Sequence, residues 1–366
     1  MRITFVCKNA SFDGGTRVVA TYAERLMRRG HDVLVVSLPA ERWSAPRKLR
    51  WLVTKGEWPI GPRLHGSHLH ATGVPHKVID AHRPITADDL PDADAIIATW
   101  WETAEWVNAM PPKKGRKLYF IQHHEVHMGS PAERVDATWR LPLQKIVISQ
   151  WLEDLARERF GDVGVIRVPN SVDTGLFHAP PRGRQRQPTV GLLYSTAHFK
   201  GLDISLPAIA RLKEKLPELR LIAFGHGQVS DQLPLPEWAE FHPSPAQDRI
   251  RELYALCDVW LCGSRAEGFH LPPLEAMACR CPVVSTRVGG PQDIVRDGYN
   301  GFLVDLGDSG GLAARLADVL NLPDDRWLAM SNAALQTAVD YTWDDATDRF
   351  EEALRTTVDA RRGVTA

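Results

Sequence analysis

Two glutamates separated by seven residues, Glu267 and Glu275, flank a predicted helix start. An apolar run ends at Cys262, and Pro272 and Pro273 suit the first turn of a helix, where a missing N–H group does no harm. A helix N-terminus attracts a diphosphate, and a carboxylate in the first turn, where we place Glu275, can accept hydrogen bonds from paired sugar hydroxyls. The passage therefore indicates a nucleotide site. In the simpler interpretation, both carboxylates only complement the helix dipole.

Gly14 and Gly15 follow the first apolar run, Ile3–Cys7, directly before a helical pattern. Because parallel sheets bind ligands at the carboxyl ends of their strands, this loop is a second place where a ligand could approach backbone N–H groups. The loop lacks the G-x-G-x-x-G pattern, which removes the main support for a nicotinamide or flavin site. Two glycines in a tight turn are the alternative.

The passage Glu267-Gly-Phe-His-Leu-Pro-Pro-Leu-Glu275 resembles the signature of the retaining glycosyltransferase family 4, the glycosyl transferases group 1. The likeness covers nearly the whole chain, through further motifs at 14–15, 168–177, 200–201, 288–291 and 300–302. It implies the GT-B fold, an α/β architecture of two Rossmann-like doubly wound domains facing an inter-domain cleft. It also implies a nucleotide-diphosphate sugar as the donor substrate, held mainly by the C-terminal domain.

Carried over by position, the resemblance implies that Glu275 binds the ribose and that Glu267 lies near the transferred sugar and the diphosphate. It also implies that Lys200 neutralises the diphosphate as the sugar bond breaks, although a solvated lysine at a helix start is the alternative. The expected catalytic residues are Lys200, Glu267, His123 and His124. The expected donor-binding residues are Gly14, Gly15, Ser195, Lys200, Glu267, Gly268, Phe269, His270, Leu271 and Glu275.

Two positions depart from the family pattern. Many members carry an arginine five residues before the lysine, where this chain has Ser195, so donor binding would depend more on the lysine and on helix N-termini. Members also often have a sugar-contacting histidine after the strand predicted at Leu118–Gln122, where this chain reads Gln122-His123-His124. If Gln122 occupies the histidine position, His123 and His124 are its neighbours; the sequence leaves open which of the three faces the sugar.

No metal site is predicted. His124-Glu-Val-His127 is not the H-E-x-x-H pattern, and His65-Gly-Ser-His-Leu-His70 has no matching cysteine or carboxylate pattern. Asp92-Ala-Asp94 resembles the D-x-D of metal-dependent transferases, but it precedes a strand instead of following one. We therefore expect no cofactor and no metal requirement.

The elements that must position these residues alternate between short apolar runs and amphipathic helical patterns, which predicts parallel strands covered on both faces. Strands are predicted at Ile3–Cys7, Val33–Ser37, Asp94–Ala98, Leu118–Gln122, Lys145–Ser149, Val165–Val168, Thr189–Tyr194, Leu219–Phe224, Val259–Cys262 and Pro282–Thr286. Helices are predicted at Thr16–Arg29, Leu202–Lys215, Asp248–Leu256, Pro272–Ala278, Gly311–Leu320 and Trp343–Val358.

A run rich in Pro, Arg and Gln, at 178–187, indicates a linker. We therefore expect an N-terminal acceptor-side domain at 1–177 and a C-terminal nucleotide-sugar-binding domain at 188–342. The remaining residues, 343–366, are expected to form a C-terminal helix that packs back on the N-terminal domain.

The composition is ordinary for a globular protein. The 366 residues include 44 Lys+Arg and 45 Asp+Glu, and this balance argues against a general nucleic-acid binder. No apolar run approaches the ~18 residues that a membrane span needs, and the first residues lack the apolar length of a signal peptide, so we expect a cytoplasmic protein. Five cysteines without a C-x-x-C pair fit buried thiols in a reducing compartment.

The segment 41–63 is basic and contains Trp43, Trp51 and Trp58. Basic residues attract anionic head groups and tryptophan prefers the interface, so one interpretation is peripheral contact with the inner face of the membrane. The alternatives are a loop whose tryptophans pack inward and a surface that binds an oligosaccharide or protein-bound acceptor.

Together these features predict a retaining glycosyltransferase that moves a hexose-like sugar from a nucleotide-diphosphate donor to an acceptor hydroxyl. The acceptor would be a glycan, a lipid-linked molecule or a small molecule. One alternative is a nucleotide-sugar epimerase of the same fold, which needs an added pair of carboxylates as acid and base that the sequence does not identify in the N-terminal half. The other is a catalytically weak nucleotide-sugar-binding protein, for which Ser195 and Gln122 are the indications.

Overall fold

The computed structural model describes residues 1–39, 46, 49, 52 and 67–360. Apart from Pro46, Leu49 and Leu52, the predicted membrane or acceptor segment 41–63 lies outside these residues. The chain forms two compact units. Unit 1 comprises Met1–Val147, Leu155–Ile166 and Thr347–Ala366, and unit 2 comprises Ile148–Asp154 and Arg167–Ala346.

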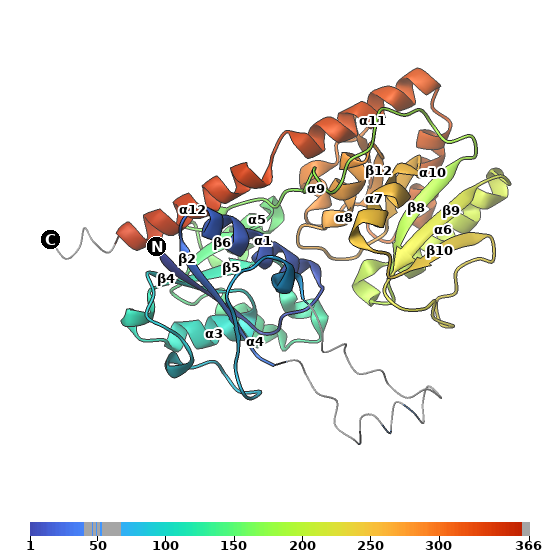
Figure 1. The fold of residues 1–366 in the computed structure, drawn as a ribbon. Helices are drawn as coiled ribbons and strands as arrows, with labels where there is room; N and C mark the ends of the chain where they lie inside the picture. The colour runs from blue at the N-terminus through green and yellow to red at the C-terminus, as the bar shows by residue number, and fades with distance from the viewer. Residues whose placement is uncertain (40–45, 47–48, 50–51, 53–66, 361–366) are drawn as a thin grey trace. The chain divides into compact units, whose positions relative to one another are not determined.

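Unit 1 is built on a seven-stranded sheet with the order β3-β2-β1-β4-β5-β6-β7 (Figure 1). Its strands are β1 (Arg2–Cys7), β2 (Asp32–Ser37), β3 (His76–Val78), β4 (Ala95–Ala98), β5 (Arg116–Ile121), β6 (Gln144–Val147) and β7 (Ile166–Arg167). Its helices are α1 (Gly14–Arg28), α3 (Trp101–Ala109), α4 (Ala132–Thr138) and the larger parts of α5 (Gln150–Phe160) and α12 (Trp343–Asp359). Short 3₁₀ turns are η1 (His68–Ala71), η2 (Ala87–Asp89), η3 (Pro112–Lys114) and η4 (Glu125–Met128).

Unit 2 contains a six-stranded sheet with the order β10-β9-β8-β11-β12-β13. Its strands are β8 (Thr189–Tyr194), β9 (Arg220–Gly225), β10 (Ala239–Pro243), β11 (Val259–Cys262), β12 (Val283–Thr286) and β13 (Gly301–Val304). They are flanked by η5 (His198–Lys200), α6 (Leu202–Lys215), α7 (Gln247–Ala255), α8 (Leu271–Ala278), α9 (Pro291–Ile294), α10 (Ser309–Leu320) and α11 (Asp324–Val339). All strand pairs of this sheet are parallel.

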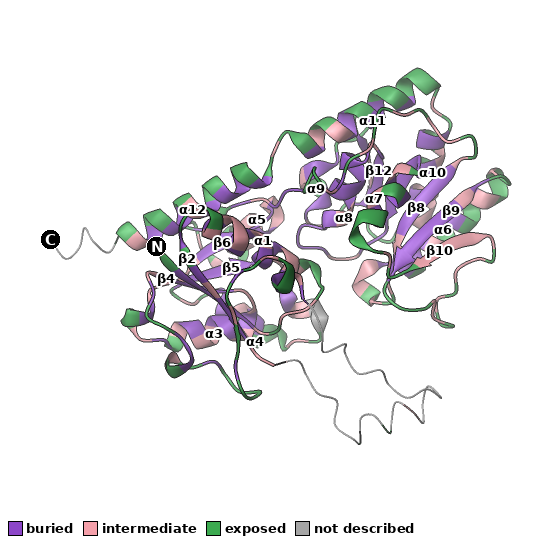
Figure 2. Cartoon of the chain, in the orientation of Figure 1, coloured by how far each residue is buried: buried purple, intermediate pink, exposed green. Residues whose placement is uncertain are grey.

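The central strands of both sheets are buried on both faces, and Figure 2 shows them in purple beneath helices whose outer faces are green. This explains why their sequences are continuously apolar. The predicted α/β class with two doubly wound parallel sheets is confirmed. The strands β3, β10 and β13 were not predicted from the sequence. Each has half-buried or exposed positions, so the apolar run that identifies a central strand is missing.

Strand order reverses at one place in each sheet. In unit 1 the chain proceeds outward from β1 to β2 and β3, and then returns to β4 on the other side of β1. In unit 2 the same reversal separates β8 from β11. Loops at the carboxyl ends of such neighbouring strands diverge and leave a crevice, which is where open parallel sheets bind ligands.

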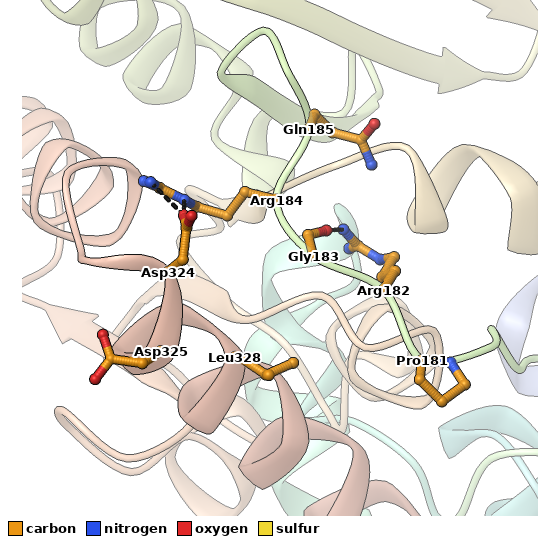
Figure 3. A pocket seen from close by; sticks show the side chains of 8 residues that line it. All are labelled: Pro181, Arg182, Gly183, Arg184, Gln185, Asp324, Asp325 and Leu328. Carbon is orange, nitrogen blue, oxygen red and sulfur yellow. Dashed lines mark hydrogen bonds and ion pairs between the residues drawn. The ribbon is translucent and has the colours of Figure 1, made fainter.

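The segment 178–187, which was predicted as a linker, contains no helix or strand and lies within unit 2. Arg182 donates to the backbone carbonyls of Cys257 and Arg280 and lies over the ring of Trp327. Figure 3 shows Arg184 turned toward Asp324 in the pocket beside this segment. The segment is therefore anchored along unit 2, and the chain enters that unit at 167.

The last helix, α12, begins in unit 2 and continues into unit 1. Its Phe350 is fully buried and stacks on Tyr22 of α1, with ring centroids 4.3 Å apart. Phe5 and Phe120, from β1 and β5, complete this aromatic cluster. The end of the chain thus contributes to the core that forms around its beginning. Among the described residues, no helix has the length and apolar character needed to cross a bilayer.

Candidate active site

The main candidate site lies in unit 2, where the loops after β8 and β11 meet beside the strand reversal. The two loops touch at Gly201, whose backbone lies so close to Gly263 that a Cβ on Gly201 would lie 1.8 Å from the Gly263 carbonyl oxygen. Its φ of +62° also belongs to the left-handed region, which side chains other than glycine rarely adopt. This close approach sets the start of α6 directly against the end of β11 and brings Lys200 to Glu267.

Lys200 and Glu267 form an ion pair in which one ammonium contacts both carboxylate oxygens. Lys200 Nζ lies 2.8 Å from Oε1 and 3.0 Å from Oε2 of Glu267. The hydroxyl of Ser264 donates to Glu267 Oε1 at 2.6 Å, and His270 Nε2 lies 3.4 Å from the same oxygen. Glu267 is only 5% exposed, so these partners replace the water that the carboxylate would otherwise bind.

The neighbours of Glu267 decide the charges in this cluster. Burial alone would raise the pKa of the Glu267 carboxyl, but His270, the Lys200 ammonium and the Ser264 hydroxyl outweigh it and bring the pKa below its ordinary value. Burial lowers the pKa of His270 to about 4, with the Glu267 charge opposing this and Lys200 reinforcing it. At neutral pH the glutamate of this cluster is therefore ionised and the histidine is neutral.

The loop that carries Glu267 is supported by a second glycine loop after β12. A Cβ on Gly289 would lie 1.9 Å from the Glu267 carbonyl oxygen, and a Cβ on Gly290 would lie 2.1 Å from that of Phe269. Gly290 N–H and the indole N–H of Trp151 both donate to the carbonyl of Gly268. These contacts explain why two glycines follow β12, since any side chain would push the Glu267 loop away.

Helix α8 begins at Leu271, directly after His270, which caps it with a left-handed backbone at φ 65°. Glu275 was predicted in the first turn, but the helix starts one residue before the prolines, so Glu275 lies in the second turn. Prolines are tolerated there because N–H groups throughout the first turn have no intrahelical acceptor.

Glu275 is 5% exposed, and the hydroxyl of Tyr254 donates to its Oε2 at 2.9 Å. Burial, and then the Glu275 charge, raises the pKa of Tyr254 far above its usual value, so the phenol remains a donor. Phe269 and Leu271 are buried. Ser195 Oγ accepts a hydrogen bond from Ala197 N–H within its own loop.

In unit 1, the glycine pair opens α1 instead of preceding it. Asp13 caps the helix by accepting the N–H of Thr16, and Gly14 is the first helical residue. The side-chain amide of Gln122 donates to the carbonyl of Gly15 at 3.2 Å. Of the three candidate positions after β5, Gln122 thus faces the glycine loop.

His123 and His124 have different surroundings from Gln122. His123 Nδ1 lies 3.1 Å from the carbonyl oxygen of His124. His124 packs edge-on against Trp139, and its Nε2 lies 2.9 Å from Asp136 Oδ1. The His124 side chain is 9% exposed, and its contacts with Asp136 and Trp139 connect it to α4.

Glu125 is a buried titratable residue at the carboxyl edge of the unit 1 sheet that sequence reasoning did not select. It is 2% exposed and accepts the N–H of Trp101, the first residue of α3, at 2.9 Å. Burial raises its pKa to about 8, with the Trp101 N–H and Lys8 opposing this and Glu102 adding to it. Lys8 itself forms an ion pair with Glu102. The only sequence signal was the position of Glu125 directly after two histidines at a strand end.

Metal-binding groups do not cluster in the described part of the chain, where no set of three or more His, Cys, Asp or Glu side chains is placed to hold an ion. All five cysteines are buried free thiols. Burial raises the pKa of Cys7 and of Cys279 to about 12, so both remain protonated and unreactive.

Comparison with known sequences gives one family match and several related proteins. Residues 179–336 match the family described as "Glycosyl transferases group 1". A D-inositol 3-phosphate glycosyltransferase of Mycolicibacterium paratuberculosis is 33% identical over 184 residues, covering 46% of this chain and 41% of the relative. A putative glycosyltransferase, EpsD, of Bacillus subtilis is 35% identical over 126 residues, covering 32% of each chain. The matches thus span less than half of the length of these relatives.

Comparison with solved structures extends over both units. HepE of Anabaena in complex with UDP aligns with a TM-score of 0.75 at 17% identity, covering 97% of this chain and 100% of that one. Sucrose-phosphate synthase of Thermosynechococcus elongatus aligns with a TM-score of 0.72 at 15% identity, covering 98% and 100%. At these identities the likeness establishes the fold.

Proposed function

We propose that this chain transfers a sugar from a nucleotide-diphosphate donor to an acceptor hydroxyl. The proposal starts from the GT-B fold of the chain and from the match of residues 179–336 to the glycosyl transferases group 1. The placement of Lys200, Glu267 and Glu275 around one strand reversal in unit 2 carries this proposal. A cation at a sheet's carboxyl edge, beside the start of α8, is suited to a diphosphate.

The transfer proceeds with retention at the anomeric carbon. Lys200 and the positive end of the α8 dipole stabilise the negative charge that develops on the diphosphate as its bond to the sugar breaks. The leaving phosphate oxygen takes the proton of the acceptor hydroxyl on the same face, so no protein nucleophile is needed. Glu267 lies beside the transferred, hexose-like sugar. The acceptor is a glycan, a lipid-linked molecule or a small molecule.

Metal ions are not required in this proposal, because Lys200 and backbone N–H groups supply the positive charge. Transfer measured with excess EDTA should equal transfer measured with Mg²⁺ or Mn²⁺. If chelation abolished transfer and either ion restored it, the proposed independence from metal ions would be wrong.

The ribose of the donor binds to Glu275, whose carboxylate Tyr254 already orients. Glu275→Gln should weaken nucleoside diphosphate binding about tenfold, because a charged acceptor for the ribose hydroxyls is lost, and should leave the chemical step unchanged. Calorimetric titration with UDP, GDP and ADP measures the affinity. Glu214→Gln, an exposed glutamate on α6, is the matched control. Equal affinities for wild type and Glu275→Gln would remove the ribose assignment.

The decisive test of the function has two stages. A thermal-shift screen against UDP, GDP, ADP and TDP identifies the base, since a ligand that binds the folded state raises the melting temperature. The corresponding nucleotide sugars are then incubated with glycan, lipid-linked and small acceptors, and the anomeric configuration of the product is determined by NMR. Absence of any nucleotide effect, or an inverted product, would contradict the proposal.

One observation favours a second candidate, a nucleotide-sugar epimerase. Glu102 and Glu125 are neighbouring carboxyl groups in unit 1, and Glu125 is held mostly protonated at neutral pH. An acid and a base of this kind are what an epimerase needs. Product analysis separates the two, because an epimerase yields an isomerised or hydrolysed sugar without an acceptor.

A further inference from the structure

The ion pair between Lys200 and Glu267 occupies the ammonium group that the diphosphate of the donor would need. Lys200 is the ammonium that the proposed function assigns to the diphosphate, yet both of its short contacts are to Glu267. The neighbouring guanidinium of Arg265 is paired with both carboxylate oxygens of Asp203, at 2.7 Å each. Within the described residues, the cluster around Glu267 thus offers one ammonium to two competing anions.

Glu267 needs a replacement partner once Lys200 turns to the diphosphate. A buried carboxylate without a counter-charge is costly, and a single neutral hydroxyl, that of Ser264, does not compensate for a lost ammonium. His270 is the remaining polar side chain next to it, with Nε2 at 3.4 Å. Because Nε2 faces a carboxylate, it carries the proton, which leaves Nδ1 as the unprotonated nitrogen.

Nδ1 of His270 is buried and has no hydrogen-bond partner among the described residues. An unpaired nitrogen of this kind is unusual in a side chain that is more than nine-tenths buried. It is also the atom at which this imidazole can accept a second proton. The unpaired Nδ1 therefore indicates that His270 makes a further interaction in a state other than the ligand-free one.

We propose that donor binding moves Lys200 from Glu267 to the diphosphate, and that His270 takes up a proton from solvent at Nδ1 and becomes the cation that holds Glu267 in place. This inference rests on the proposed function. His270 is a positioning residue in this scheme, acting on the sugar through Glu267. Once protonated, Nδ1 carries an N–H group that can donate a hydrogen bond to a diphosphate or sugar oxygen.

The charges around His270 favour this exchange. In the ligand-free cluster the pKa of His270 is lowered by Lys200 and raised by Glu267. When the Lys200 ammonium moves away and the donor diphosphate arrives, both changes raise the pKa of His270 and favour its protonated form. Among the described residues, the charged groups that act on His270 are Glu267 and Lys200. The Cys262 thiol at the end of β11 also lies near Glu267, but burial raises its pKa far above the usual value and it stays neutral. The segment Val288–Pro291 has no titratable side chain, and the contact from α5 is the Trp151 indole.

Proton uptake on binding is measured by isothermal titration calorimetry at pH 7.5 in phosphate and in Tris, whose ionisation enthalpies differ. The titrants are UDP-glucose, GDP-glucose and ADP-glucose, because a nucleotide sugar, unlike a free nucleoside diphosphate, has no phosphate group that titrates near neutral pH. We expect the wild type to take up roughly one proton per bound donor. A binding enthalpy that does not depend on the buffer would overturn the proposal.

The test variant is His270→Asn, since asparagine is neutral and accepts the left-handed backbone at this position. It should bind the same donor about tenfold more weakly and without proton uptake. His226→Asn, at an exposed histidine of the same unit, should behave as the wild type. Uptake that persists in His270→Asn would place the proton elsewhere and also overturn the proposal. If no nucleotide sugar binds the wild type at all, the proposed function itself fails, and this outcome is distinct from binding without protons.

Discussion

At the scale of single residues, two buried glutamates have opposite charge states because their neighbours differ. Glu267 has an ammonium on both oxygens and remains ionised in spite of its burial. Glu125 is equally enclosed, but a single backbone N–H and a more distant lysine do not compensate, and its pKa rises to about 8. The residue type is the same, and the partners decide whether it acts as a fixed charge or as an acid.

Replacement of Lys200 has to keep Glu267 satisfied, because removal of the whole side chain would leave a buried charge unpaired. Lys200→Gln keeps a donor for Glu267 but removes the positive charge. We expect the transfer rate of the folded variant to fall about a hundredfold or more. The melting temperature should fall as well, because a neutral amide compensates the buried Glu267 carboxylate less well than the ammonium does. Lys215→Gln, an exposed lysine at the end of α6, is the control. A rate for Lys200→Gln that matches this control would show that Lys200 does not act on the diphosphate.

Glu125 gives the stability of unit 1 a predictable pH dependence. The folded pKa of about 8 lies above the ordinary value of 4.5, so between these values the folded state retains a proton that the unfolded state has lost. Stability therefore decreases as the pH rises through this window, by a few kcal/mol in total, and levels off above about pH 8.

Glu125→Gln keeps the acceptor for Trp101 N–H and cannot ionise. Its melting temperature should exceed that of the wild type at pH 8 and should depend less on pH between 5 and 8. Glu133→Gln, at an exposed position of α4, controls for the change in net charge. Parallel melting curves for wild type and Glu125→Gln would mean that Glu125 is ionised in the folded protein.

At the scale of elements, the proposed donor site is made by loops that touch through their backbones. The end of β11 meets the start of α6 through Gly201 and Gly263, and the loop before α8 meets the loop after β12 through Gly289 and Gly290. Each contact is too close for a side chain. The strands are positioned by apolar packing, and the glycines then set the distance between the loops that the strands carry.

Gly290→Ala should therefore displace the Glu267 loop without disturbing the sheet. The added Cβ would lie 2.1 Å from the Phe269 carbonyl oxygen, so that backbone must shift. We expect donor affinity in calorimetry to fall at least tenfold and the melting temperature to fall slightly. Gly183→Ala, where a Cβ meets nothing within 4 Å, is the matched control. Unchanged donor binding in Gly290→Ala would show that this loop contact does not position the site.

At the scale of the whole molecule, the two units are not consecutive in sequence. The chain leaves unit 1 after Val147, returns at Leu155, leaves again after Ile166 and returns at Thr347. Helices α5 and α12 therefore belong to both units. The final return matters for stability, because Phe350 of α12 supplies a fully buried ring to the aromatic cluster of Phe5, Tyr22 and Phe120.

Phe350→Ala should destabilise unit 1 by about 3–5 kcal/mol, since a large buried ring is replaced by a cavity. Differential scanning calorimetry should show one transition moved to lower temperature while the nucleotide-stabilised transition of unit 2 is retained. Leu306→Ala, at a residue that is 56% exposed, should leave both transitions in place. A melting profile of Phe350→Ala identical to that of the wild type would mean that unit 1 folds without α12.

The sequence by itself determined the fold class and most central strands, because strands buried on both faces require continuous apolar runs, which are a local property. It also located the E-x7-E passage and Lys200. It missed β3, β10 and β13, whose partly exposed residues carry no such signal. It placed the start of α8 at Pro272, one residue after the observed start at Leu271, and therefore put Glu275 in the first turn instead of the second. Proline is favoured at the first helical position, so the pair of prolines suggested a start there.

Only the tertiary structure decided which charges meet. The pairing of Lys200 with Glu267, the packing of His124 on Trp139 and the contact of Glu125 with Trp101 each join residues from different elements. The apolar pattern predicts that loops after parallel strands lie at the carboxyl edge of their sheet, but not which atoms touch. Charge states depend on desolvation and on partners within a few ångströms, and these exist only once the chain has folded.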